Sequence, residues 1–521
     1  MGTINKFALT YFPAVFTGAL LYLSFPTPDI HFLSWVALVP LIYSILNSNG
    51  HGYSFKAGVV AGVIYFFGTQ YWISHSINNY GHLPLVASMS IVLLLSLYQS
   101  IYTGVFCLLL HLAAKKTKVP VYISAPSLWV GLEYFRGILF SGFPWSYLGY
   151  TQYKILPLIQ IADITGVYGI SFLIVFFNAV IADFIIKGRT PERPFIRKLL
   201  PFAYFTVIMA VVFTYGYKRL NNNMAANTVR VSVIQGNVEQ EKKWDKNFTA
   251  TIIDTYKTLT LKAVSDGAKL VIWPESSLPF LFGSDKNHTE DLISFQKELG
   301  IYLVFGTDLV RGYKNGRYSL TNSAVVLAPD GKILCIYDKI HLVPFGEYVP
   351  LRDVLFFIDK LVTGIGDFTQ GKTLTIAKTP LGGFAAPICY EIAFSELVGA
   401  FYRYGGDFIV TITNDAWFGR TSGPYQHFIM AVFRAIETRK PVMRAANTGI
   451  SGFIDSNGAV MAKSELFEKA IITRDINTNP AITFFSLFGG IFAHICNIIN
   501  LAIIIKLIKG RSQRQPRRIP E

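Results

Sequence analysis

Charged residues are scarce in this 521-residue chain, and two long stretches have none. Asp, Glu, Lys and Arg make up 15% of the sequence, and none of them occurs at residues 57–114 or 476–505. A soluble helix needs one polar face, whereas a bilayer span needs about 20 uninterrupted apolar residues. The lack of charge, with a hydrophobic share of 52%, excludes an ordinary soluble protein and predicts an integral membrane protein.

Cysteine is also rare, with four in the chain: Cys107, Cys335, Cys389 and Cys496. No CxxC or His-rich spacing is present, so the sequence predicts neither a metal site nor a cofactor. Cys107 and Cys496 lie within hydrophobic stretches, which leaves Cys335 and Cys389 for chemistry. Cys335 falls in the alternating strand pattern KILCIYD and is expected to be a packed, small apolar residue.

The basic residues are placed as membrane topology requires. The net charge is +15, and much of the excess lies in short loops and the C-terminal tail, around residues 115–118, 187–198 and 506–518. Basic residues concentrate in cytoplasmic loops beside membrane spans. This placement accounts for the charge without nucleic acid, and we expect no nucleic-acid partner.

The hydrophobic pattern predicts eight transmembrane helices. They are expected near residues 7–25, 30–47, 57–76, 85–113, 120–139, 157–186, 199–217 and 481–505. We interpret the first as an uncleaved helix, because no small-x-small cleavage site follows it. Alternation from a cytoplasmic N-terminus places the loops near 28, 80 and 148 outside, where Lys154 is the only Lys or Arg beyond the span ends.

Residues 227–478 have a different pattern. Short apolar runs such as VRVSVI, KLVIW and FIVTIT alternate with helical patterns and turns, which predicts an α/β domain of about 250 residues. The predicted organisation is a seven-helix membrane domain (1–220), an extracytoplasmic α/β domain (227–478), a C-terminal span (480–508) and a basic cytoplasmic tail (509–521). The tether after residue 217 is about ten residues, which reaches at most about 35 Å. A short tether favours a substrate that resides in the membrane.

Three segments of the α/β domain carry residues suited to acyl transfer. They are Trp273-Pro274-Glu275-Ser276, then Asp338-Lys339 with Pro344-Phe345-Gly346-Glu347-Tyr348, and Pro387-Ile388-Cys389-Tyr390-Glu391. A thiol where a strand gives way to a helix lies near backbone N–H groups that favour a thiolate and an oxyanion. A carboxylate can take the thiol proton, and an ammonium can stabilise the negative charge that develops. Taken singly, Glu275 and Lys339 could be surface charges and Cys389 a buried apolar residue.

These motifs, in this order, resemble the Glu, Lys and Cys motifs of the nitrilase superfamily. Three further segments resemble the apolipoprotein N-acyltransferases within it: PFGEYVP (344–350), CYE (389–391) and NDAWF (414–418). Similar segments of that family occur at 142–150 and 160–169 in the membrane half. Another runs from Val233 to Asn237 and leads to Trp244.

The resemblance implies an α-β-β-α sandwich and a set of roles. Cys389 would be the nucleophile, Glu275 the general base, and Lys339 the group that stabilises the oxyanion and thioester. Glu347, Tyr390 and Glu391 would support the site, and Trp244 would line or gate it.

The implied reaction moves an acyl group from a phospholipid resembling phosphatidylethanolamine onto the diacylglyceryl-cysteine amine of an apolipoprotein. It would take place at the periplasmic side of the bacterial inner membrane. Because the two substrates use the site in turn, ping-pong kinetics are expected.

Two other functions remain open at this point. A membrane-tethered amidohydrolase would use the same three residues, although it has no evident need for seven preceding helices. A transporter with an inert appended domain is disfavoured because few ionisable residues lie in the predicted spans. Glu133 and Arg136, three residues apart in the fifth span, are candidates for either a functional or a structural ion pair near the outer face.

Overall fold

The computed structural model describes residues 2–48, 50–188, 195–221, 227–314, 317–349 and 368–512. Within those ranges the chain divides into two compact units. The first unit is built from residues up to 74, residues 85–219 and the C-terminal segment from 490. The second unit contains residues 75–84 and 220–489. Most of the predicted tail at 509–521, and Pro350 of the PFGEYVP motif, lie outside the described residues.

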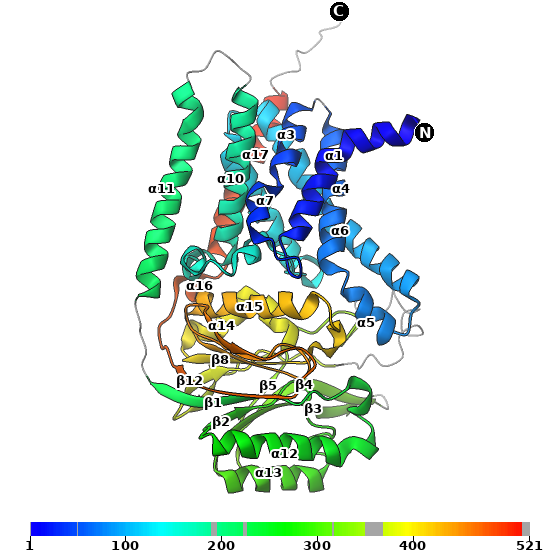
Figure 1. Cartoon of the computed structure of the whole chain (residues 1–521), viewed down its shortest axis with the longest axis vertical. Helices are drawn as coiled ribbons and strands as arrows, with labels where there is room; N and C mark the ends of the chain where they lie inside the picture. Colours follow the sequence, from blue (N-terminus) through cyan, green and yellow to red (C-terminus); the bar gives the residue numbers. More distant parts are fainter. Residues whose placement is uncertain are drawn as a thin grey trace, which may run out of the picture. The chain divides into compact units, whose positions relative to one another are not determined.

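The first unit is helical (Figure 1). Its longer helices are α1 (Gly2–Leu23), α3 (Val39–Asn47), α4 (His51–Gln70), α6 (Leu85–Lys116), α7 (Val121–Ile138), α10 (Val167–Gly188), α11 (Phe195–Leu220) and α17 (Ile491–Ser512). Among the described residues, four helices are long and apolar enough to cross a membrane: α6, α10, α11 and α17. Helices α4 and α6 approach closely at Gly58, where an added Cβ would clash with the backbone of Thr103 and Gly104. Small residues allow this close backbone approach between apolar helices.

Two predicted spans are wrong at their starts. The span expected at 157–186 begins with short helices α8 (Leu156–Ile159) and α9 (Ala162–Thr165), and α10 starts only after Gly166. The span expected at 481–505 begins with α16 (Phe484–Phe488), and Gly489 separates α16 from α17. Both glycines have positive φ, +62° and +57°. A left-handed glycine ends a helix whatever the hydropathy of the sequence around it.

The second unit contains two six-stranded mixed sheets. The strand order is β12-β1-β2-β3-β4-β5 in the first sheet and β11-β10-β9-β8-β7-β6 in the second. The strands of the first sheet are β1 (Thr228–Gln235), β2 (Leu270–Ile272), β3 (Tyr302–Lys314), β4 (Arg317–Leu327), β5 (Ile333–Asp338) and β12 (Ala470–Asn477). Those of the second are β6 (Ala377–Thr379), β7 (Gly382–Ala385), β8 (Phe408–Thr413), β9 (Val442–Ala446), β10 (Gly452–Ile454) and β11 (Val460–Lys463). In each sheet three central strands are parallel (β1–β2–β3 and β7–β8–β9) and the outer strands are antiparallel.

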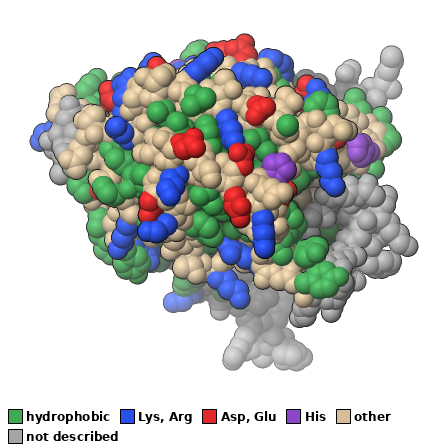
Figure 2. Space-filling model, turned by 90° about the horizontal axis from the view of Figure 1, so that it is seen from below, with side chains coloured by type: hydrophobic (Ala, Val, Ile, Leu, Met, Phe, Trp, Pro, Cys, Tyr) green, Lys and Arg blue, Asp and Glu red, His purple; other side chains and the backbone are tan. Residues whose placement is uncertain are grey.

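Helices cover the outer faces of the two sheets (Figure 1). Helices α12 (Thr249–Ser265) and α13 (Lys286–Leu299) lie outside the first sheet, and α14 (Ser395–Phe401) and α15 (Gly423–Thr438) lie outside the second. Strand β8 is buried along its whole length, which explains why its sequence, FIVTIT, has no charged residue. Figure 2, viewed from below, shows acidic and basic side chains interspersed with apolar ones, as on a water-facing surface.

The sheets bring the ends of β2, β5, β7 and β8 together. Close passage of the chain after β2 depends on Gly306 in β3, because a Cβ there would lie 2.5 Å from the Ser276 nitrogen and 2.6 Å from the Glu275 Cα. The predicted turns at Pro329–Gly331 and Asp455–Gly458 are present, each closed by backbone hydrogen bonds.

Candidate active site

Glu275 lies three residues beyond the end of β2, in a buried position. Its side chain is 6% exposed. One carboxylate oxygen accepts a hydrogen bond from Asn322 Nδ2 at 2.8 Å, and the other accepts one from the Asn414 backbone N–H at 2.8 Å. The next residue, Ser276, has a φ of +43°, which is uncommon for a residue with a side chain. The carboxylate is therefore fixed from two sides at a sharp turn of the chain.

Lys339 follows β5 and joins two carboxylates. Its Nζ donates to Glu347 Oε1 at 2.9 Å and lies 3.4 Å from Glu275 Oε1, and the residue is 1% exposed. Burial alone would lower the pKa of Lys339, but the carboxylates of Glu347 and Glu275 outweigh burial and raise that pKa. Lys339 is therefore a permanent ammonium, and an ammonium has three donors, of which these contacts use two.

Glu347 holds Lys339 in place. Its Oε1 accepts from both Lys339 Nζ and Asn322 Nδ2, the latter at 2.8 Å. Its Oε2 accepts from the Val343 backbone N–H at 2.8 Å, which closes the Pro/Gly turn. Asn322 thus bridges Glu275 and Glu347 with one amide group.

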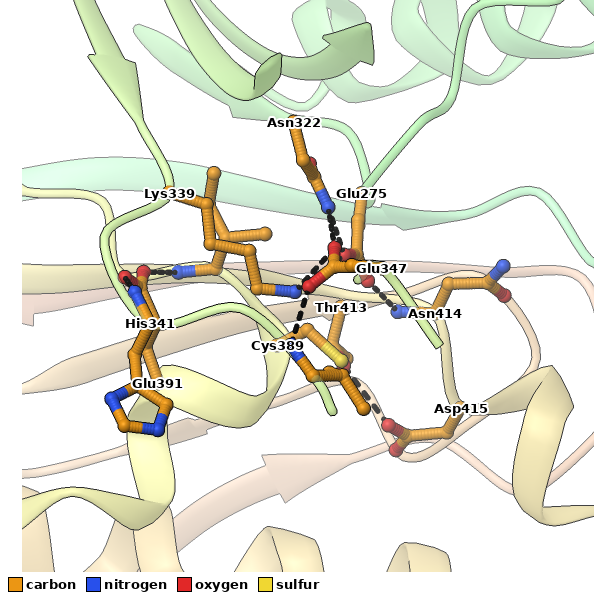
Figure 3. A network of polar contacts seen from close by, with 12 residues as sticks. Glu275, Asn322, Lys339, His341, Glu347, Cys389, Glu391, Thr413, Asn414 and Asp415 are labelled. Carbon is orange, nitrogen blue, oxygen red and sulfur yellow. Dashed lines mark hydrogen bonds and ion pairs between the residues drawn. The ribbon is translucent and has the colours of Figure 1, made fainter. Parts of the chain in front are cut away.

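Cys389 begins the short 3-10 helix η7 (Cys389–Ala393) just after β7. Its φ is +51°, and its side chain is 7% exposed. Burial, reinforced by the Glu275 carboxylate, raises the pKa of the Cys389 thiol, and Lys339 only partly opposes the rise. Figure 3 shows Cys389, Lys339, Glu275 and Glu347 converging from separate elements. A protonated thiol beside a carboxylate and an ammonium requires a base before it can attack.

Glu391 and Tyr390 lie beside Cys389 but have different surroundings. Glu391 is fully buried; its Oε1 accepts from the Tyr337 hydroxyl at 2.7 Å and from two backbone N–H groups, those of Ile340 and His341. Glu391 therefore fixes the chain just after Lys339. Tyr390 packs edge-on against the Phe394 ring, with centroids 5.0 Å apart.

Trp244, predicted to line or gate the site, is 47% exposed. The adjacent Lys243, which the sequence did not single out, is 3% exposed and donates to the Glu275 backbone carbonyl at 3.3 Å.

Sequence reasoning also missed residues that support the site through hydrogen bonds. Asn322 had no signal, because it lies in the middle of β4. Asn414 belongs to the NDAWF segment, but its contribution is a backbone N–H, which no side-chain pattern reveals. Asp415 accepts from Arg444 Nη2 at 2.9 Å, and His427 Nδ1 lies 2.9 Å from both Asp415 Oδ1 and Arg444 Nη2; all three side chains are fully buried. His427 Nε2 donates to the Cys389 carbonyl at 3.1 Å.

This second network is strongly ionic. Burial opposes ionisation of Asp415, but Arg444 and His427 outweigh burial and lower its pKa. Within the described residues there is no group of three or more His, Cys, Asp or Glu placed to hold a metal ion. Cys335 lies in β5, where burial raises its pKa to about 11; unlike Cys389, it has no carboxylate or ammonium among the causes of its pKa shift.

Comparison with known proteins matches both halves of the chain. Residues 17–180 match the apolipoprotein N-acyltransferase N-terminal domain, and residues 230–482 match the carbon–nitrogen hydrolase family. The chain is 40% identical to the apolipoprotein N-acyltransferase of Geobacter metallireducens over 95% of both chains. It is 32% identical to that of Haemophilus influenzae over 96% of this chain and 95% of the relative.

Among solved structures, Saccharomyces cerevisiae Nit3, a member of branch 10 of the nitrilase superfamily, is similar with 16% identity and a TM-score of 0.39. It covers 57% of this chain and 99% of its own. The family matches and the full-length relatives lead to one conclusion: the chain belongs to the apolipoprotein N-acyltransferase family, the membrane-bound branch of the nitrilase superfamily.

Proposed function

We propose that this protein N-acylates bacterial apolipoproteins through a thioester on Cys389. The observation that carries the proposal is the convergence of Glu275, Lys339 and Glu347 on the Cys389 thiol at buried strand ends. The chain is an acyltransferase by family, and these residues supply a nucleophile, a proton carrier and a fixed positive charge. The acyl donor in this proposal is a phospholipid such as phosphatidylethanolamine, and the acceptor is the amine of a diacylglyceryl-cysteine.

In the first half-reaction the Cys389 sulfur forms a bond to the ester carbonyl carbon of the phospholipid. Glu275 takes the thiol proton, and the Lys339 ammonium, with its remaining N–H, stabilises the tetrahedral oxyanion. The ester C–O bond then breaks, and Glu275 returns the proton to the departing lysophospholipid oxygen. The products are an acyl-thioester and a lysophospholipid.

In the second half-reaction the neutral α-amine of the lipoprotein attacks the thioester carbonyl. Its unperturbed pKa of about 7.7–8.0 leaves a useful neutral fraction near pH 7. Glu275 accepts a proton from the amine nitrogen, the C–S bond breaks, and Cys389 recovers its proton. The amide forms without water or an added cofactor.

The supporting residues have separate roles in this proposal. Glu347 orients the Lys339 ammonium, and Glu391 fixes the chain that follows Lys339. Tyr390, buried beside Cys389, would contact the acyl donor. Trp244, half-exposed and anchored through Lys243, would line the entrance or gate it.

The membrane arrangement is part of the proposal. Seven helices precede the catalytic domain of residues 227–478 and an eighth (480–508) follows it. The domain then faces the periplasm, and the tail at 509–521 faces the cytoplasm. The Lys and Arg bias of the loops supports this orientation. A reporter that is active only outside the cytoplasm should be active near Asn227 and inactive near Arg189, and the reverse pattern would remove lipoproteins as substrates.

The deciding experiment uses the purified chain in lipid micelles, with phospholipid and a synthetic diacylglyceryl lipopeptide. Mass spectrometry of the lipopeptide should show the addition of one acyl chain. Intact-mass measurement with phospholipid alone should show an adduct on Cys389. Release of free fatty acid with no acylated peptide would instead support a membrane-tethered amidohydrolase.

A further inference from the structure

A second lysine, Lys243, lies buried beside Glu275. It is 3% exposed, and its Nζ donates to the Glu275 carbonyl oxygen at 3.3 Å. The preceding residue, Lys242, is its opposite: its side chain is 44% exposed, and its ammonium pairs with Glu239 at 2.9 Å. Of these two consecutive lysines, Lys243 is buried in the domain and Lys242 lies at its surface. A buried ammonium is costly unless it is paired, so the inward position requires a reason.

Asp308 is the carboxylate that accompanies Lys243. It lies on β3 directly opposite Asn322 of β4, the residue that bridges Glu275 and Glu347. The side chain of Asp308 is buried, with 8% exposure. Its Oδ1 has no hydrogen-bond donor within the part of the chain that the structure describes. Buried carboxylate oxygens normally have donors; the Asp308 carboxylate has one hydrogen bond, from the side chain of Ser276, and the charge of Lys243 acts on it.

The charges around the thiol show what this pair contributes. Glu275, Glu347 and Asp308 are three buried or nearly buried carboxylates, and Lys339 supplies one positive charge among them. Like charges held together disfavour ionisation of one another, and a second positive charge opposes that effect. A proton on Glu275 would prevent it from accepting one from Cys389. Lys243 supplies a second positive charge, bonded to the backbone carbonyl of Glu275.

The titration of the pair agrees with this geometry. Burial lowers the pKa of Lys243 to about 8 and raises the pKa of Asp308 to about 6. Lys243 faces Glu275, Asp308 and Cys389, and Asp308 faces Lys243, Glu275 and Glu347.

We propose that Lys243 is a positioning residue for Glu275, holding its backbone and favouring its ionised form, and that Asp308 limits this effect by partly balancing the Lys243 charge. The inference rests on the proposed function, since it concerns the proton acceptor of thioester formation. It assigns a role to two residues outside the Glu–Lys–Cys motif.

The test is the pH dependence of single-turnover acylation with phospholipid, followed by intact mass on Cys389. Lys243→Met should move the acidic limb of the profile to higher pH by about 1 unit or more, the effect expected when a neighbouring opposite charge is lost. Lys242→Met is the matched control and should reproduce the wild-type profile. Lys243→Arg keeps the charge and should preserve the position of the acidic limb.

Asp308→Asn provides the second arm. Removing a competing negative charge should move the acidic limb to lower pH. The double variant Lys243→Met/Asp308→Asn should lie between the two single variants, because the two opposite shifts offset each other. A Lys243→Met profile that superimposes on that of Lys242→Met overturns the inference.

If Lys243→Met fails to fold, the pH profiles of Asp308→Asn and Lys243→Arg test the inference instead. An acidic limb of Asp308→Asn that stays at the wild-type pH overturns it. Failure of the proposed function is distinguishable, because Cys389→Ala would then still acquire an acyl group. If Cys389→Ala forms no acyl adduct and the pH profile of Lys243→Met is unshifted, only the role assigned to Lys243 is wrong.

Discussion

Buried charges are handled differently in the helical unit and in the catalytic domain. In the helical unit, Arg136 donates to the backbone carbonyls of Trp145 at 2.6 Å and Ser146 at 3.3 Å. Glu133 Oε1 accepts from the Leu148 N–H at 2.8 Å and from Trp129 Nε1 at 2.9 Å. Both side chains thus fasten the loop that follows α7. In the catalytic domain, Lys339 pairs with Glu347 and Glu275, and each of these carboxylates also accepts from Asn322 and from one backbone N–H.

The difference indicates which buried charges are available for chemistry. Arg136 cannot carry a proton, because a guanidinium stays charged in proteins, and Glu133 holds the loop after α7. The Lys339 ammonium and the Glu275 carboxylate instead lie beside Cys389 (Figure 3). On this ground we infer that Glu133 and Arg136 are structural, whereas the Glu275–Lys339–Glu347 cluster serves the reaction.

The largest expected effect is loss of the nucleophile. Cys389→Ala should abolish both the acyl adduct and the acylated lipopeptide, since no thioester can form without the sulfur. Cys335→Ala is the matched control and should retain activity within a few-fold. Intact mass after mixing with phospholipid measures both variants, and an adduct on Cys335 would contradict the assignment.

The two charged partners should come next. Glu275→Gln should slow thioester formation by about 10²–10⁴-fold, the contribution of a positioned acid–base group. Lys339→Met should slow it by about 10²–10³-fold, the usual loss when one oxyanion donor is removed.

An activated thioester donor separates these two roles. Its good leaving group lessens the need for proton transfer, so it should partly rescue Glu275→Gln. It should rescue Lys339→Met less, because an oxyanion forms with any acyl donor. Wild-type acylation by Lys339→Met in a single-turnover assay would show that its charge does not serve the oxyanion.

A smaller effect, on stability, should follow disruption of the buried ionic network below Cys389. Asp415→Asn should destabilise the catalytic domain by about 3–5 kcal/mol, because it leaves Arg444 buried without its counter-charge. The pKa of Asp415 is lower in the folded protein than in the unfolded chain, where it is about 3.9. Its stabilisation is therefore present above that pH and is lost as pH falls toward the folded value. Thermal denaturation at pH 7 and at progressively lower pH should show the wild-type advantage shrinking.

The smallest effect is expected from a substitution in the helical unit. It tests most directly whether the buried charges of that unit are structural. Arg136→Met should cost about 1.5–3 kcal/mol of stability, the contribution of hydrogen bonds from a charged donor. The folded fraction should still acylate Cys389 at close to the wild-type rate. Melting temperature and single-turnover rate, measured on one preparation, separate these outcomes. A stable but inactive Arg136→Met would mean that this charge also serves the reaction.

Much of this protein was determined by its sequence alone. The lack of charge at residues 57–114 and 476–505 predicted membrane helices, because lipid excludes unpaired charge. Short or alternating apolar runs predicted β1, β2, β5 and β8 within a few residues, since period-two alternation and short buried runs are strand signatures. Glu275, Lys339 and Cys389 were recognisable because each follows a strand and lies within a distinctive motif.

Only the tertiary structure decided how the site is assembled and which charges it uses. Asn322, Lys243 and Asp308 have no motif of their own. Asn322 and Asp308 lie near Glu275 because β3 and β4 pair beside the end of β2, whereas Lys243 comes from the segment that follows β1. Gly166 and Gly489 end helices inside apolar stretches, which hydropathy does not register. The ionisation of a buried side chain depends on the charges that the fold brings within a few ångströms of it, and residues far apart in the chain supply those charges. Local sequence therefore predicts which chemistry is present, whereas the packing of strands from both sheets decides which groups hold and move the proton.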